Sequence, residues 1–198
     1  MAKLLFAYNR TVLGNEGPYD NKANDPGGET IFGITRKYQS TWPGWKIFDD
    51  WAGPVPGARS LAAIVAFVTT DEAMQCEIKW FYERGPWAAV RGFEIEDQAV
   101  AEELFDSAIN CGLVTVVKWL QRSLNIFNRG GTDYPDIEVD GYFGNQTLEC
   151  LNALLKRRGP GLILKALNAL QGVNYMSIAE KNPALEDFEA GWWIRRID

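Results

Sequence analysis

The stretch from Glu16 to Thr35 constrains the fold more than any other part of this 198-residue chain. It reads EGPYDNKANDPGGETIFGIT, which is an acid, a polar loop rich in turn residues, and a short strand-like run. Apolar side chains upstream recur at helical spacing, and Glu16 continues their series; they are Leu5, Tyr8 and Val12. The Gly-Pro pair after Glu16 ends a helix. We therefore predict a helix that ends on the Glu16 carboxylate, then a polar loop and a strand over 30–35.

A carboxylate on the inward face of a helix end is partly removed from water. Desolvation raises the pKa of such a group and lets it hold a proton near neutral pH, as a general acid must. On this interpretation Glu16 is a candidate catalytic acid. The alternative is that Glu16 is an exposed residue on the last turn, with no chemical role.

The chain contains no histidine. This excludes Ser-His-Asp and Cys-His catalysis and removes the commonest zinc ligand. Cysteine occurs only three times, at wide spacing and without a C-x-x-C pair, so we expect reduced core thiols and no metal knuckle. Two-carboxylate glycosidase chemistry is the largest catalytic class that remains, and it requires no metal or cofactor.

The motifs E-G-P-Y, D-P-G-G-E-T and F-G-I-T resemble those of the glycoside hydrolase family 108 N-acetylmuramidases of phage endolysins and prophage-like genes. The matching residues are Glu16, Tyr19, Asp25, Pro26, Gly27, Gly28, Thr30, Gly33, Ile34 and Thr35. Pro18 replaces the family's second glycine. The resemblance implies a mainly α, lysozyme-like helical fold with a small β-hairpin near the active site and a C-terminal helical region packed against it.

The resemblance also implies a catalytic set. Glu16 would be the general acid, Asp25 the base or electrostatic stabiliser, and Thr30 a residue that positions water. Asp20 competes with Asp25 for the second role, because the loop conformation decides which acid faces the cleft. Asp25, which precedes a proline, is alternatively only a turn former.

Three further residues, Tyr19, Asp20 and Gly28, are candidate substrate-binding residues. Tyr19 is equally compatible with a packing role.

The activity implied is hydrolysis of the β-1,4 bond between N-acetylmuramic acid and N-acetylglucosamine in peptidoglycan. A carboxylate separation of about 6.5–9.5 Å would indicate inversion, and about 5–5.5 Å retention. Two alternatives stay open. A lytic transglycosylase also uses one acid, and a non-catalytic cell-wall-binding or secretion-assisting protein could keep the same fold.

The rest of the chain reads as helices. We predict a short helix from Thr35 that ends at the Trp42-Pro43-Gly44 turn, an irregular segment over 49–57, and helices over the ranges 60–68, 71–84, 96–110, 113–125, 148–158, 161–181 and 184–197.

The D-G-x-x-G-x-x-T pattern at 140–147, before one of these helices, resembles peptidoglycan-binding modules of wall hydrolases. A simple turn with an Asn145 or Thr147 helix cap explains it equally well. We predict a catalytic region over 1–109 and a peptidoglycan-binding-like helical region over 110–198.

The net charge of −6 argues against nucleic acid or anionic membrane as a partner, because no basic run provides a phosphate footprint. No stretch approaches the ~20 apolar residues of a membrane span, and the first residues lack a signal-peptide pattern. We expect a monomer that is synthesised in the cytoplasm, is released by a holin-type or other route, and then acts on peptidoglycan glycan strands.

Overall fold

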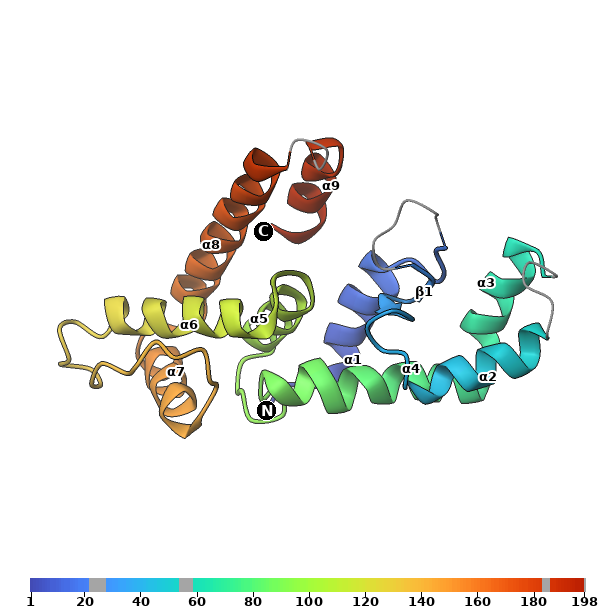
Figure 1. Ribbon diagram of the computed structural model, residues 1–198. Helices are drawn as coiled ribbons and strands as arrows, with labels where there is room; N and C mark the ends of the chain where they lie inside the picture. Colours follow the sequence, from blue (N-terminus) through green and yellow to red (C-terminus); the bar gives the residue numbers. More distant parts are fainter. Residues whose placement is uncertain (22–27, 54–58, 183–185, 198) are drawn as a thin grey trace. The chain divides into compact units, whose positions relative to one another are not determined.

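The computed structural model describes residues 1–21, 28–53, 59–182 and 186–197 (Figure 1). The described chain is mainly α and contains one small antiparallel hairpin, which confirms the predicted fold class. It divides into two compact units, Leu5–Gly85 and Met1–Leu4 with Pro86–Asp198. The predicted division between 109 and 110, and the packing of one region against the other, stay predictions.

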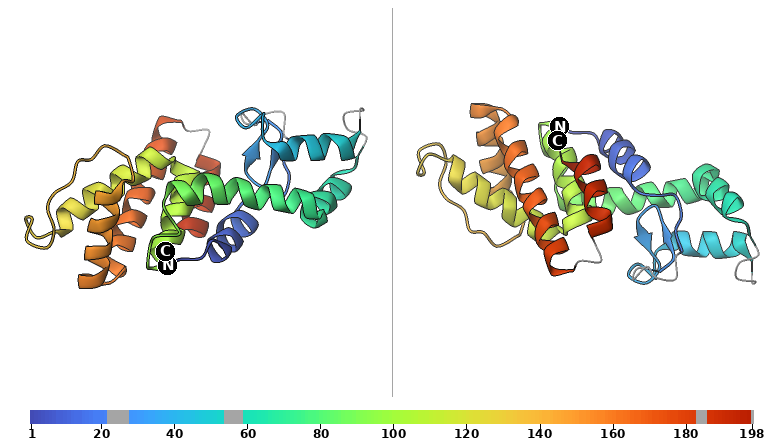
Figure 2. Two further views of the ribbon diagram at one scale, coloured as in Figure 1. Left: turned by 90° about the horizontal axis from the view of Figure 1, so that it is seen from below. Right: turned by 90° about the horizontal axis from the view of Figure 1, so that it is seen from above.

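The unit over 5–85 carries the hairpin and four of the α-helices. Its elements are α1 (Leu4–Ala7), η1 (Tyr8–Leu13, a π-helix), β1 (Thr30–Ile31), β2 (Ile34–Thr35), α2 (Pro43–Ala52), α3 (Leu61–Thr70) and α4 (Glu72–Tyr82), and a second π-helix, η2 (Glu83–Trp87), follows. Helix α4 contacts both α2 and α3, as Figures 1 and 2 show. It begins where the Asp71 carboxylate accepts a hydrogen bond from the Met74 backbone N–H, at 2.9 Å. Met74, Ile78 and Tyr82 form its buried face.

Helix α2 contradicts the prediction that Trp42-Pro43-Gly44 ends a helix. Pro43 instead occupies the first helical position, where its missing N–H costs nothing and its fixed φ suits the helix. The backbone over 36–38 forms a turn and no helix. Part of the segment predicted to be irregular is therefore helical, and Trp45 and Phe48 are buried on α2.

The N-terminal helix differs from the prediction in register. Leu5 is exposed, whereas Leu4, Tyr8 and Val12 are buried. Ala7 and Thr11 are buried as well, so the buried positions 4, 7, 8, 11 and 12 form a one-sided helical pattern that includes Leu4 in place of Leu5.

The described residues of the second unit form five α-helices: α5 (Gln98–Cys111), α6 (Leu113–Phe127), α7 (Asn145–Arg158), α8 (Gly161–Lys181) and α9 (Glu186–Arg196). Helices α5, α6 and α8 contact one another, α7 packs on α6, and α9 packs on α8 (Figures 1 and 2). The buried Asp106 carboxylate of α5 accepts a 2.8 Å hydrogen bond from Arg196 of α9. All five helices lie where the sequence predicts them, within a few residues at their ends.

Two smaller findings complete the fold. The three cysteines form no disulfide, but Cys76 is exposed, so the prediction of three core thiols is wrong at that position. No helix among the described residues is both long and apolar enough to cross a membrane.

Candidate functional site

Glu16 follows directly on the N-terminal helix. Its backbone N–H donates to the carbonyl of Thr11 at 3.3 Å, five residues back, so the wide π-type turn extends as far as this residue. The side chain is half-buried, on the same side as Tyr8 and Val12. The structure therefore places this carboxylate at a helix end and partly out of water, as the sequence predicts.

The segment predicted as one strand over 30–35 is a tight hairpin instead. Thr30 pairs with Thr35 and Ile31 with Ile34, so the turn consists of Phe32 and Gly33 alone. Both turn residues have positive φ, 44° and 80°, as a type I′ turn requires. Phe32 is buried and bulky, and such a residue is unusual at positive φ. The Phe32-Gly33 pair therefore differs from the Asn-Gly or Asp-Gly pair that usually indicates such a turn.

The Glu16 carboxylate lies against this turn. A Cβ atom at Gly33 would be 3.0 Å from the Glu16 Oε2 atom and 2.8 Å from the Tyr82 hydroxyl oxygen. Only a glycine therefore fits both the backbone conformation and the space. The Tyr82 hydroxyl donates to the Phe32 carbonyl at 2.5 Å. Helix α4 thus holds the turn against which Glu16 rests.

Tyr82 is itself held by the N-terminal helix, because its ring packs edge-on against the ring of Tyr8 with 6.2 Å between centroids. Burial raises the pKa of the Tyr8 phenol to about 12. Tyr8 and Tyr82 are therefore packing residues, and the structure brings the helix before Glu16, the hairpin and α4 together around one carboxylate.

The open end of the hairpin carries three of the predicted residues. Asp20 and Thr30 exchange backbone hydrogen bonds of 3.0 and 2.8 Å, so an isolated antiparallel bridge joins Asp20 to β1. The Thr30 hydroxyl donates to the Gly28 carbonyl at 3.1 Å. The hydroxyl proton is therefore used in this bond, whereas the lone pairs of the hydroxyl oxygen can accept a hydrogen bond from water.

Tyr19 packs against Phe48 of α2, with 5.8 Å between nearly parallel rings, and its hydroxyl donates to Glu29 at 2.9 Å. Burial raises the pKa of the Tyr19 phenol to about 12, and the Glu29 carboxylate adds to the shift. Of the two roles considered from the sequence, the packing role matches these contacts.

Sequence reasoning missed Glu29 and Arg36. The Arg36 Nε–H donates to Glu29 at 2.5 Å, and its two terminal nitrogens donate to Asp49 of α2 at 3.0 and 2.7 Å. The guanidinium also lies 4.2 Å from the ring centre of Trp45. Glu29 and Arg36 are placed symmetrically about the Phe32-Gly33 turn, so a correct hairpin register would have predicted the pair.

Asp25, the predicted second catalytic group, lies outside the described residues. The described part of the site places the half-buried Glu16 carboxylate at the meeting point of a helix end and a hairpin, and Asp20 and Glu29 at the other end of that hairpin are half-buried too. Such a group can donate a proton to an oxygen of a bound ligand. No group of three Cys, Asp or Glu residues suited to a metal ion occurs in the described ranges.

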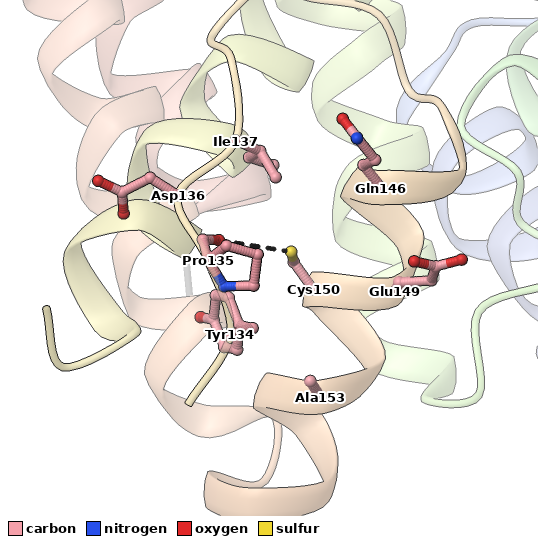
Figure 3. A pocket seen from close by; sticks show the side chains of 8 residues that line it. All are labelled: Tyr134, Pro135, Asp136, Ile137, Gln146, Glu149, Cys150 and Ala153. Carbon is pink, nitrogen blue, oxygen red and sulfur yellow. Dashed lines mark hydrogen bonds between the residues drawn. The ribbon is translucent and has the colours of Figure 1, made fainter. Parts of the chain in front are cut away.

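The second unit carries pockets of its own. One, of about 360 Å³, lies between the segment Tyr134–Ile137 and helix α7 (Figure 3). Gln146 and Glu149 line it from α7, and Cys150 faces the Pro135 carbonyl at 4.0 Å. A second pocket of about 270 Å³ shares Ile137 and Gln146 with the first. Amides and carboxylates of this kind can hydrogen-bond to hydroxyl and amide groups of a ligand.

The D-G-x-x-G-x-x-T pattern is a turn that α6 fixes in place. Gln121 donates to the Asp140 carboxylate at 2.7 Å and accepts from the Gly141 N–H at 2.9 Å. The predicted cap by Asn145 or Thr147 is wrong, because Gly144 is the N-cap residue and no side chain bonds to it. At Gly141, whose φ is 84°, a Cβ would lie 2.8 Å from a Val114 methyl carbon and 3.1 Å from the Val114 carbonyl oxygen, so α6 packs closely against this turn.

Two family models and a number of solved structures match this chain. The model of the family described as Glycosyl hydrolase 108 matches residues 9–112, and the model described as Predicted Peptidoglycan domain matches residues 115–197. The structure of Brucella abortus SagA has 24% sequence identity and a TM-score of 0.60 over 98% of this chain and 90% of that one, which shows a shared fold. No curated protein matches the chain.

Proposed function

Because the chain belongs to the Glycosyl hydrolase 108 family, we propose that it is a peptidoglycan hydrolase of the N-acetylmuramidase type. It cleaves the β-1,4 bond between N-acetylmuramic acid and N-acetylglucosamine, with Glu16 as the general acid. The match of residues 115–197 to a peptidoglycan domain supports the glycan strand as substrate. The wall is reached after holin-type or other release from the cytoplasm.

The observation that carries this proposal is the position of the Glu16 carboxylate. It is half-buried, follows a helix end, and rests against a hairpin turn where only glycine leaves room for it. Glycoside hydrolysis needs one carboxylic acid that protonates the leaving oxygen at the moment the glycosidic bond breaks. A carboxyl group held between two elements keeps its direction toward that oxygen.

A second group completes the reaction. In the proposal Asp25 acts as base or electrostatic stabiliser, and Asp20 is its competitor. The Asp20 backbone is paired with Thr30, so the backbones of these two proposed site residues lie next to each other at the open end of the hairpin. Thr30 positions the attacking water through the lone pairs of its hydroxyl oxygen, since the proton is donated to Gly28.

The test compares wild type with Glu16→Gln on purified peptidoglycan, by loss of turbidity and mass spectrometry of the released fragments. Removing a general acid lowers the rate about 10²- to 10⁴-fold. Glu72→Gln is the matched control, because Glu72 is an exposed acid on α4 of the same unit.

The chemical ends of the released fragments distinguish a muramidase from a lytic transglycosylase and from a non-catalytic wall-binding protein. Reducing N-acetylmuramic acid ends, produced by wild type and the control alone, support the muramidase. Anhydro ends would identify a lytic transglycosylase. If no variant releases fragments but all bind the wall, the enzyme proposal fails and a non-catalytic wall-binding protein takes its place.

A further inference from the structure

Three arginines surround one aspartate on the second unit, at a surface pocket of about 410 Å³ lined by these four residues. Arg157 Nη1 lies 3.3 Å from Asp133 Oδ1, and Arg158 Nη2 lies 3.4 Å from Asp133 Oδ2. Arg129 Nη1 lies 3.8 Å from Asp133 Oδ1. We call these four residues the arginine pocket.

The charges in the arginine pocket do not balance. Three guanidinium groups and one carboxylate leave an excess of two positive charges, in a chain whose net charge is −6. The Asp133 side chain is only 5% exposed, whereas those of the three arginines are between 36% and 64% exposed. The carboxylate therefore lies beneath the arginines, and most of their N–H donors face solvent.

The arginines come from two separate segments. Arg157 and Arg158 belong to the last turn of α7, where cations are favoured by the helix dipole. Arg129 comes from a different helix end, because it directly follows Asn128, the C-cap residue of α6. The C-terminal ends of two helices thus bring three guanidinium groups to one carboxylate.

The loop after α6 is built to place Arg129. The backbone of Arg129 is in the left-handed region, with φ 58°, and Gly130 and Gly131 after it also have positive φ. The buried Asn128 holds the loop, since its carbonyl accepts from the Asp133 N–H at 3.0 Å and its side-chain oxygen from the Gly131 N–H at 3.1 Å. Arg129 and Asp133 are therefore fixed on one short turn.

A guanidinium group recognises planar oxyanions, and carboxylates above all, by two parallel N–H···O hydrogen bonds. We propose that the arginine pocket binds a free carboxylate of a peptidoglycan stem peptide. The ligand follows from the proposed function, and the pocket lies within the residues that match the peptidoglycan domain. A cluster of three arginines on an acidic chain suits one carboxylate better than an extended polyanion, for which a long basic surface is needed.

The test is isothermal titration calorimetry of the full chain with a disaccharide–tripeptide, N-acetylglucosaminyl-N-acetylmuramyl-tripeptide. This probe lacks the bond that the proposed activity cleaves, so binding is measured apart from catalysis. Arg157→Gln and Arg129→Gln each weaken binding about tenfold, as expected for the loss of one charge-assisted hydrogen bond. Lys156→Gln, which removes a neighbouring charge outside the pocket, leaves the affinity unchanged.

Two further probes test the chemistry. The same disaccharide–tripeptide with amidated carboxylates binds at least tenfold more weakly than the free acid, and wild-type binding weakens as salt is added. Equal binding of the amidated probe, or unchanged affinity in both arginine variants, would overturn the proposal. Tighter binding of a phosphate-rich wall teichoic acid than of the disaccharide–tripeptide would overturn it as well.

Failure here is distinct from failure of the proposed activity. Wild type that cleaves peptidoglycan but binds the probe independently of the arginines retains its function and loses this site. Arginine-dependent binding without any cleavage keeps the site and overturns the hydrolase.

Discussion

The two long loops of the molecule are held in different ways. The hairpin loop, by which we mean the described residues of 17–36, is tied to α2 by charges and rings: Tyr19 bonds to Glu29, Glu29 to Arg36, and Arg36 to Asp49. In the α6–α7 loop, residues 128–144, most of the side-chain bonds to α6 come from neutral amides, although the ion pairs of Asp133 with the arginine pocket also lie on this loop. We therefore expect the ties of the hairpin loop to weaken with salt more than the amide bonds of the α6–α7 loop do.

The amides that bond the α6–α7 loop come from Gln121 and Asn125 of α6 and from Asn128, the residue that caps its C-terminus. Asn125 both accepts from and donates to the backbone of Ile137, at 2.9 and 2.8 Å. Such bonds fix the main chain itself and are not screened by salt. In the hairpin loop the bonded groups are charged side chains, partly exposed, whose attraction weakens as ionic strength rises.

The largest effect is expected where the hairpin loop meets Glu16. Gly33→Ala places a methyl group against the Glu16 carboxylate and the Tyr82 hydroxyl at a positive φ. We expect a loss of about 2–4 kcal/mol in the free energy of unfolding, from backbone strain and overpacking together. Urea denaturation measures this loss of stability. We expect the rate of peptidoglycan cleavage to fall as well, because the Glu16 carboxylate is displaced from the turn.

Gly130→Ala in the α6–α7 loop is the matched control. Its φ is 63°, but no atom lies within 4 Å of the added Cβ. It therefore suffers only the backbone strain of about 1–2 kcal/mol. If both variants lost the same free energy of unfolding, the contact of Glu16 and Tyr82 with the turn would contribute nothing to the cost of Gly33→Ala.

The next prediction distinguishes loop contacts made by a neutral amide from loop contacts made by a charged side chain, by their dependence on salt. Gln121→Leu removes an amide that bonds three atoms of the α6–α7 loop and the Thr147 hydroxyl of α7, and we expect a loss of about 2 kcal/mol at either salt concentration. Arg36→Met keeps an apolar stem over Trp45 but removes the charge, at a cost of about 1 kcal/mol in dilute buffer. Urea denaturation in 0.05 and 1 M NaCl checks both. A salt-independent Arg36→Met effect would contradict the comparison.

These two loops also show what the sequence could and could not predict. The ends of α5 to α9 were predictable, because Gly112, Gly159 and a proline interrupt clear apolar periodicity. The helix ending at Glu16 followed from its Gly-Pro terminator. Helix α2 was missed because a proline at the first helical position looks the same in sequence as one that ends a helix.

Within the candidate site, the residue that prevented a correct prediction of the hairpin register is Phe32. A type I′ turn normally carries Asn, Asp or Gly, so a buried aromatic residue there hides the hairpin register. Without the register, the pairing of Glu29 with Arg36 was not visible. The bond from Tyr82 to Phe32 spans 50 residues of sequence, and no local pattern reveals such a contact.

The smallest effect concerns pH. Hydrogen bonds from Gln121 and from the Tyr142 N–H lower the pKa of the exposed Asp140 carboxyl. Because the folded pKa is lower than the unfolded one, the contribution to stability is complete above the ordinary pKa of about 4 and is lost as pH falls through the lowered value. Asp140→Asn, which imitates the protonated acid, therefore has a lower Tm than wild type from pH 7 to 5.

The difference in Tm shrinks below about pH 4, as differential scanning calorimetry would show. A difference that stayed constant down to pH 2 would mean that the negative charge of Asp140 contributes nothing to the α6–α7 loop.

The bond between Tyr82 and the hairpin turn has a consequence for synthesis. A two-stranded hairpin is marginal in water by itself, and this one has two residues in each strand. Its stability therefore depends on α4, whose last residue follows Glu16 by more than sixty positions. A nascent chain that has exposed Glu16 but not yet Tyr82 has no assembled site, so the geometry around the acid arises only after α4 has left the ribosome.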